Sequence, residues 1–137
     1  MRELLIEKAR EAREKAYCPY SRYMVGASVL GENGKIYTGC NIENASYGMT
    51  VCAERTAIFT MVADGCRKFE ALAVIGSSND DGAPCMACRQ VMTEFCASME
   101  TPVYVAGPSG DTFYTHTMKE LCPYPFQVFT ESKDYHN

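Results

Sequence analysis

Two short segments contain cysteine and glutamate residues at spacings that suit metal binding and proton transfer. The first, Val51-Cys-Ala-Glu-Arg55, places a cysteine two residues before a glutamate. The second, Ala83-Pro-Cys-Met-Ala-Cys-Arg-Gln90, contains two cysteines spaced C-x-x-C directly after a proline. Cysteines three residues apart on the first turn of a helix project to the same side, so the pair can share one metal ion.

Cys52 provides a third sulfur from a distant part of the chain. It lies 33 residues before Cys85, and one expected helix, one strand and one loop fill the interval. A crossover of this kind can bring two helix N-termini to one edge of a sheet, where Cys52, Cys85 and Cys88 would meet. Three thiolates suit zinc and leave its fourth tetrahedral position open, which is typical of a catalytic site. A zinc ion held in this way makes a bound water acidic enough to supply hydroxide near neutral pH.

Glu54 follows Cys52 by two residues, so its carboxylate can turn over the open position instead of ligating the metal. The sequence predicts that Glu54 moves a proton from the water to the substrate and later to the leaving group. The alternative is an acidic residue that is merely stabilised by the helix dipole. Zinc with three thiolates carries a net charge of −1, so Arg55 or Arg89 is expected to hydrogen-bond the sulfurs, unless both are ordinary surface residues.

The elements that must position these residues alternate between helix and strand. The pattern predicts helices, strands and turns over these residues: helix 3–16, strands 25–30 and 35–40, helix 52–64, strand 71–75, loop 76–83, helix 86–98, strand 101–106, turn 107–111, strand 112–115 and a short capped helix from 117 that ends at Pro123. Asn33-Gly34 favours a hairpin with a type I′ turn between the first two strands. This order predicts an α/β fold with three α-β-α layers and a five-stranded mixed sheet, formed as one domain over residues 1–137.

Composition limits the classes of partner. The 137 residues carry a net charge of −4, and basic residues in the first helix alternate with glutamates, so we expect no nucleic acid and no membrane surface as partner. The apolar run at the N-terminus is broken at once by charges, so we expect no export signal, a cytoplasmic location and reduced thiols. Most of the eight cysteines are then small buried hydrophobes.

At these motifs the chain resembles the cytidine deaminase family, in its small homotetrameric branch with three cysteine ligands. C-x-E followed by P-C-x-x-C is the pattern of zinc-dependent deaminases. The resemblance extends from the first helix to about Phe126 and includes three further motifs: Tyr17-Cys-Pro-Tyr-Ser-Arg-Tyr-Met-Val-Gly-Ala27, Gly39-Cys-Asn-Ile-Glu-Asn44 and Cys88-Arg-Gln-Val91. It implies hydrolytic deamination of free cytidine and deoxycytidine to uridine, deoxyuridine and ammonia in pyrimidine salvage. One Zn²⁺ would be held in each subunit of a homotetramer, with hydroxide attacking C4.

The resemblance also implies roles for five residues outside the zinc motifs. Asn41 and Glu43 correspond to the pair that binds the ribose 3′-hydroxyl, and Tyr23 to an aromatic residue of the base pocket, usually Phe. Phe126 corresponds to an aromatic residue that reaches a neighbouring subunit's pyrimidine, and Tyr47 lies in a segment that reaches a neighbouring site. These implied roles make the active sites shared between subunits.

Two departures from the family pattern keep a second substrate class open. Met86 replaces the glycine that usually lies between the two motif cysteines, and is expected to narrow the pocket. Pro125 stiffens the approach to Phe126, where the family has small residues, so Phe126 is expected to be displaced. The same chemistry on a modified cytidine, a nucleoside antibiotic or a related amino-heterocycle is therefore an alternative.

Other functional interpretations of the sequence explain fewer of these motif residues. A deoxycytidylate deaminase usually has His in place of Cys52, and Glu43 would repel a phosphate. A nucleic-acid deaminase would need a basic surface. A structural zinc module, closed by a fourth ligand from Cys40, Cys96, Cys122 or His116, or a redox C-x-x-C protein would not need Glu54.

Overall fold

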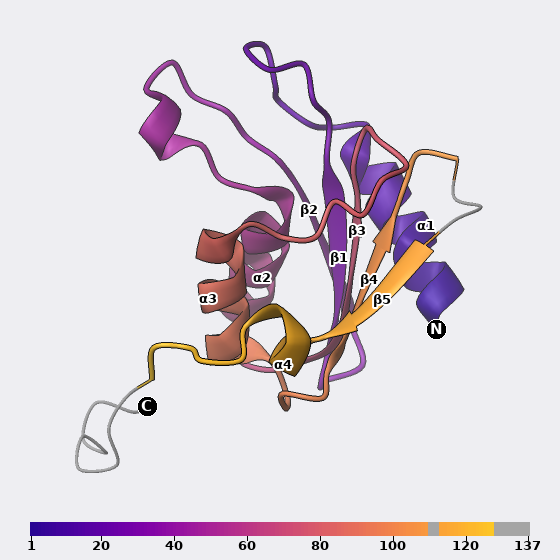
Figure 1. The fold of residues 1–137 in the computed structure, drawn as a ribbon, viewed down its shortest axis with the longest axis vertical. Coiled ribbons are helices and arrows are strands. Elements are labelled where there is room, and N and C mark those ends of the chain that lie inside the picture. Colours follow the sequence, from indigo (N-terminus) through magenta and orange to yellow (C-terminus); the bar gives the residue numbers. More distant parts are fainter. Residues whose placement is uncertain (110–112, 128–137) are drawn as a thin grey trace.

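The computed structural model describes residues 1–109 and 113–127 of the chain (Figure 1). Its elements follow the expected order: α1 Arg2–Arg13, β1 Gly26–Gly31, β2 Ile36–Cys40, the 3₁₀ turn η1 Tyr47–Met49, α2 Ala53–Ala63, β3 Phe69–Ile75, α3 Met86–Phe95, β4 Pro102–Ala106, β5 Phe113–Thr117 and α4 Met118–Leu121. The turn expected at 107–111 and the strand expected at 112–115 lie partly outside the described residues. The strand is found at Phe113–Thr117. Within the described ranges, no helix has the length and apolar character needed to cross a bilayer.

The five strands form one mixed sheet in the order β2-β1-β3-β4-β5, which confirms the predicted fold class. Strand β1 is antiparallel to both of its neighbours, β2 and β3, so β2 and β3 run in the same direction. Strands β3 and β4 are parallel, and β5 returns antiparallel to β4. The helices that follow β2 and β3 therefore cross over between strands of the same direction, and both begin at the same edge of the sheet.

Helices cover both faces of the sheet, as the sequence predicts (Figure 1). Helix α1 covers one face over a small cluster that includes Leu5, Ala73 and Ile75. Helices α2, α3 and α4 lie on the other face, over a larger core that includes Ile58 and Met92. Burial of this apolar surface from both sides of the sheet is the main force that fixes the three layers.

The hairpin between β1 and β2 is confirmed, but its turn differs from the prediction. Gly34 has φ +84°, whereas Asn33 is not in the left-handed region, so the turn is not type I′. The amide of Gly34 instead donates to the carbonyl of Gly31 at 2.9 Å, and the amide of Gly31 donates to Lys35 at 2.8 Å. A turn closed in this way, followed by a left-handed glycine, is the other common means of joining twisted strands.

Two helices end earlier than their hydrophobic patterns predict. Helix α1 ends at Arg13 rather than 16, and α3 ends at Phe95 rather than 98. Beyond α3, Cys96 forms a bridge with Phe69, and the amide of Ala97 donates to the carbonyl of Phe69 at 2.8 Å. Pairing with the start of β3 thus replaces the last helical turn. The predicted capping box at Thr117 and Glu120 is confirmed, and α4 ends at Leu121, before Pro123.

Candidate metal centre and active site

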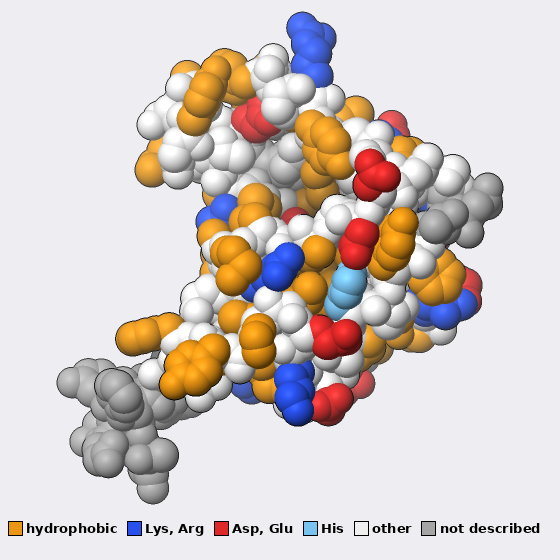
Figure 2. All heavy atoms as spheres, viewed as in Figure 1, with side chains coloured by type: hydrophobic (Ala, Val, Ile, Leu, Met, Phe, Trp, Pro, Cys, Tyr) orange, Lys and Arg blue, Asp and Glu red, His pale blue; other side chains and the backbone are white. Residues whose placement is uncertain are grey.

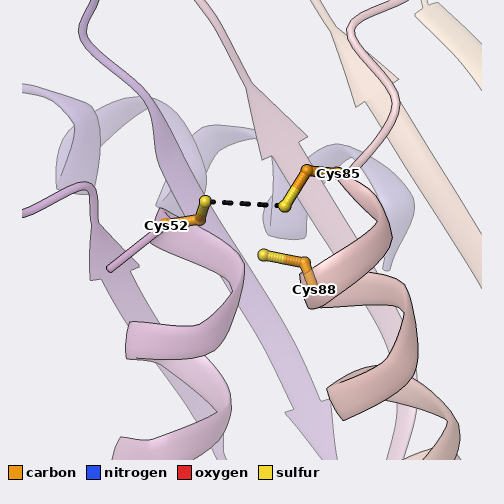
Figure 3. Close-up of side chains that lie close together, drawn as sticks. All are labelled: Cys52, Cys85 and Cys88. Carbon is orange, nitrogen blue, oxygen red and sulfur yellow. Dashed lines mark hydrogen bonds between the residues drawn. The ribbon is translucent and has the colours of Figure 1, made fainter. Parts of the chain in front are cut away.

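The sulfurs of Cys52, Cys85 and Cys88 converge where α2 and α3 begin (Figure 3). Cys52 is the N-cap residue of α2, Cys85 is the N-cap residue of α3, and Cys88 lies in the first turn of α3. The three sulfur atoms all lie within 4.8 Å of one another, and the Cys52 and Cys85 sulfurs are 3.8 Å apart. Two helix N-termini therefore direct their backbone N–H groups toward one cluster of thiols.

This donor set fits zinc. Three soft thiolate ligands that can approach one ion, with one coordination position left over, are what a catalytic zinc site requires. In the described part of the chain, no fourth Cys, His, Asp or Glu ligand atom joins the cluster. His116, one of the candidate fourth ligands, instead pairs with Asp81 at 2.9 Å. The geometry thus favours an open, catalytic metal site over a closed, structural one.

The thiols interact electrostatically before any metal binds. The pKa of Cys52 is lowered to about 5, first because the thiol of Cys88 hydrogen-bonds its sulfur and then because Arg55 does so. The pKa of Cys88 is raised in return, since its proton is held against the Cys52 sulfur. Zinc binding would displace the remaining thiol protons, so the affinity of the site for metal rises with pH.

Glu54 is a buried acid beside the sulfur cluster. Its side chain is only 5% exposed, in the first turn of α2. Burial raises the pKa of Glu54 to about 7, and the neighbouring Cys52 adds to this effect while Arg55 opposes it. A carboxyl group with a pKa near neutrality can both accept and donate a proton at physiological pH.

Arg55 and Arg89, the two candidate arginines, have different contacts. One guanidinium nitrogen of Arg55 lies 3.6 Å from the sulfur of Cys52, as the charge argument predicts. Arg89 donates instead to the backbone carbonyls of Pro84 at 2.6 Å and Leu121 at 3.0 Å. Arg55 thus lies beside the thiolates, whereas Arg89 holds the backbone at Pro84 and at the end of α4.

A cavity of about 300 Å³ opens beside the cluster, and Glu54, Cys52, Tyr23 and Asn41 are among its lining residues. The Asn41 side chain accepts a hydrogen bond from the Val25 amide at 2.9 Å and donates to the Tyr23 carbonyl at 2.7 Å. These two bonds fix the amide and hold the loop that carries the Tyr23 ring. The structure therefore brings two of the predicted substrate residues into one cavity with the predicted acid.

Glu43 and Tyr47 line a second pocket, of about 210 Å³, together with Tyr20, Ser21 and Thr50. Thr50 lines both pockets, so the two adjoin. Glu43 accepts hydrogen bonds from the amides of Tyr20 at 3.0 Å and Ser21 at 3.1 Å and from the Ser21 hydroxyl. These bonds, with that of the hydroxyl foremost, hold the pKa of Glu43 below its usual value.

Two predicted residues lie away from the cavity of their own chain. Phe126 is 78% exposed, and Met86 is 65% exposed and does not line the cavity with Glu54. The expected narrowing of the pocket by Met86 is therefore not observed within the chain. Figure 2 shows hydrophobic side chains on both sides of a hollow that lies beneath the η1 loop on this face.

Several residues at the site escaped the sequence prediction. Gly76 also lines the cavity, and a Cβ atom there would lie 2.7 Å from the Tyr23 hydroxyl, so glycine lets this ring lie against the wall. Thr50 joins the two pockets, and Ser21 holds Glu43. None of the three has a residue type or spacing that would have indicated such a position from the sequence.

Comparison with known proteins gives consistent matches over most of the chain. The family model "Cytidine and deoxycytidylate deaminase zinc-binding region" matches residues 1–105. A cytidine deaminase from Sporosarcina psychrophila is 52% identical over 90% of this chain and 90% of its own. One from Halalkalibacterium halodurans is 48% identical over 91% and 93% of the two chains. A crystal structure of a cytidine deaminase from Burkholderia pseudomallei superposes with a TM-score of 0.86 at 45% identity, over 92% of this chain and 99% of that one.

Proposed function

The chain belongs to the cytidine deaminase family, and we therefore propose that it hydrolyses free cytidine and deoxycytidine to uridine and deoxyuridine with release of ammonia. The observation that carries this proposal is the buried Glu54 beside three converging cysteine sulfurs, in a cavity of about 300 Å³. A structural zinc site or a redox pair of cysteines would have no use for such an acid.

Cys52, Cys85 and Cys88 would hold the zinc ion. When bound, zinc supplies an activated water as the nucleophile near neutral pH. Arg55 withdraws charge from the Cys52 sulfur through the contact at 3.6 Å, and the N-terminal amides of α2 and α3 add to this effect. These groups offset the excess negative charge of three thiolates.

Glu54 would transfer the protons of the reaction. It takes one proton from the nucleophilic water and gives it to N3 of the pyrimidine. It then takes the second proton of that water from the hydroxyl now on C4 and passes it to the amino group, which leaves C4 as ammonia. Burial keeps the carboxyl away from bulk water and holds its pKa at about 7, so neither of its protonation states is costly during the cycle. The α2 backbone fixes its position in the cavity wall.

Asn41, Glu43 and Tyr23 would bind the nucleoside. Tyr23 offers a flat face to the base within the cavity, and Asn41 retains a second amide hydrogen for the sugar. Glu43 lies in the adjoining pocket, where its charge favours a sugar hydroxyl and disfavours a 5′-phosphate. This charge supports a free nucleoside, rather than a nucleotide, as the substrate.

We further propose a homotetramer with shared active sites. Phe126, Tyr47 and Met49 are 78%, 73% and 64% exposed, and none of them lines the cavity that holds Glu54 in the same chain. Tyr47 and Met49 both lie in η1, and large apolar side chains that are exposed side by side indicate a protein interface. Phe126 and Tyr47 would each complete a site that belongs to a neighbouring subunit.

The experiment that tests this function compares the wild type with Glu54→Gln. Both proteins are incubated with cytidine, deoxycytidine and deoxycytidylate, and ammonia and bound zinc are measured in parallel. We expect ammonia from both nucleosides, about one zinc per chain in both proteins, and a rate ~10²–10⁴-fold lower in the variant. Glu94→Gln, an exposed acid on α3, is the control and should retain full activity.

Zinc without ammonia from either nucleoside would overturn the substrate assignment but leave the metal site in place. Full activity of Glu54→Gln would overturn the assignment of the proton-transfer role.

A further inference from the structure

The side chain of Gln90 holds the backbone of Phe126 with two hydrogen bonds. Its amide nitrogen donates to the Phe126 carbonyl at 3.0 Å, and its amide oxygen accepts from the Phe126 N–H at 3.1 Å. The Phe126 peptide groups dictate this orientation of the amide, since an N–H needs an acceptor and a carbonyl needs a donor. Gln90 thus mimics a neighbouring β-strand and specifies both the position and the direction of the chain at residue 126.

A second contact from the same helix fixes the start of this segment. Arg89 donates to the Leu121 carbonyl at 3.0 Å, so consecutive residues of α3 hold residues 121 and 126. Pro123 and Pro125 stiffen the chain between these two points. The segment after α4 passes beside α3 in Figure 1. The helix that begins with Cys85 and Cys88 therefore also determines where Phe126 lies.

This arrangement fixes the backbone of a residue whose phenyl ring its own chain does not bury. Phe126 is 78% exposed, although its backbone is fixed by two hydrogen bonds. Fixing the backbone of an exposed aromatic residue costs conformational entropy, and the ring buries too little area within the same chain to offset that cost. The fixed backbone favours binding to a partner that covers the ring, because a preorganised group loses less conformational freedom when it binds.

We propose that Gln90 is a positioning residue that presents Phe126 to the nucleoside site of a neighbouring subunit. The inference rests on the proposed function, in which Phe126 completes a neighbour's site. Gln90 does not touch the substrate. It acts through the backbone of Phe126, so its removal should weaken nucleoside binding while the chemistry at Glu54 continues.

Steady-state kinetics of Gln90→Ala test this role. We expect the KM for cytidine to rise about two- to tenfold, as for the release of one ordered side chain, with kcat changed less than KM. Glu94→Ala is the matched control, because it truncates another long polar side chain one turn further along α3. Gln90→Glu should resemble Gln90→Ala, since a carboxylate cannot donate to the Phe126 carbonyl.

A double-mutant cycle separates positioning from a general structural effect. If Gln90 acts only through Phe126, adding Gln90→Ala to Phe126→Ala should leave the KM of Phe126→Ala unchanged. A further rise of the same size in that background would overturn the proposal, as would an unchanged KM in Gln90→Ala itself.

A spectroscopic readout tests the same contact without catalysis. The chain contains no tryptophan, so Phe126→Trp introduces a single indole at this position. We expect Gln90→Ala to shift the indole emission of the assembled protein to the red and to increase its quenching by acrylamide, because the ring leaves the neighbouring subunit that covers it. If the wild type failed to deaminate cytidine, the proposed substrate would be wrong, yet this measurement would still show whether Gln90 fixes residue 126. Unchanged emission and quenching would overturn the proposal even in an active enzyme.

Discussion

At the scale of single residues, the charge around the three sulfurs depends on Arg55. Its guanidinium lies 3.6 Å from the sulfur of Cys52. Replacement by glutamine removes a positive charge that favours deprotonation of the groups beside it, so their pKa values should rise. We expect Arg55→Gln to move the acid limb of the pH–rate profile up by ~1 pH unit. Arg67→Gln, an exposed arginine far from the sulfurs in sequence, is the control, and an unchanged profile in Arg55→Gln would refute the role.

Glu43 has a pH-dependent effect of its own, and its sign follows from its contacts. The Ser21 hydroxyl and two backbone amides hold the pKa of the folded Glu43 below its ordinary value of 4.5. The resulting stabilisation is fully present above 4.5 and is lost as the pH falls through the lowered folded value. The free energy of unfolding should therefore be higher in the wild type than in Glu43→Gln at neutral pH.

Urea unfolding of both proteins between pH 7 and pH 3 measures this difference, which should shrink below 4.5. The exposed Glu70→Gln serves as the control. A difference between wild type and Glu43→Gln that stayed constant with pH would contradict the assignment.

The sequence sufficed to predict the metal ligands because helical periodicity and chain order determine their meeting point. Cys85 and Cys88 share the first turn of α3, and Cys52 begins the other helix at the same edge of the sheet. Gly76 and Ser21 could not be predicted, since their importance comes from the shape of loops that no periodic pattern encodes.

At the scale of elements, the position of Cys52 depends on how closely α2 approaches β2. A Cβ atom on Gly39 would lie 2.4 Å from the amide nitrogen of Ala57 and 2.8 Å from the carbonyl oxygen of Ala53, both on the α2 backbone. Because backbone atoms cannot rotate away, Gly39→Ala should displace the helix. We expect a loss of about 1–3 kcal/mol in the free energy of unfolding and weaker zinc retention.

Gly48→Ala is the matched control, because a Cβ atom there meets nothing within 4 Å and Gly48 has no positive φ. Urea unfolding and zinc release to a chelator measure the two effects. Unaltered stability of Gly39→Ala would show that α2 is not held by this contact.

The order and type of the elements followed from hydrophobic periodicity, while several of their ends did not. Helix α3 stops where Cys96 pairs with Phe69, a contact between residues far apart in the chain. The turn at Asn33-Gly34 takes a different form because only Gly34 adopts a positive φ. Local patterns predict which elements form, whereas tertiary pairing decides where they stop.

At the scale of the whole molecule, shared sites make activity depend on assembly. If Phe126 and Tyr47 complete sites on neighbouring subunits, an isolated chain should bind cytidine poorly. We therefore expect specific activity to fall on dilution, in step with dissociation of the proposed tetramer measured by light scattering. Undiminished activity in a monomer would contradict the shared site and the proposed role of Gln90 together.

The meeting of Cys52 with Cys85 and Cys88 also has a consequence for the lifetime of the chain. An ion bound by both α2 and α3 would cross-link residues 33 positions apart, much as a disulfide would. It would therefore hold the starts of the two helices together in the folded protein. A ligand that binds only the folded state raises stability with the logarithm of its free concentration. Zinc supply would then set how long each molecule resists heat and proteolysis as well as whether it turns over substrate.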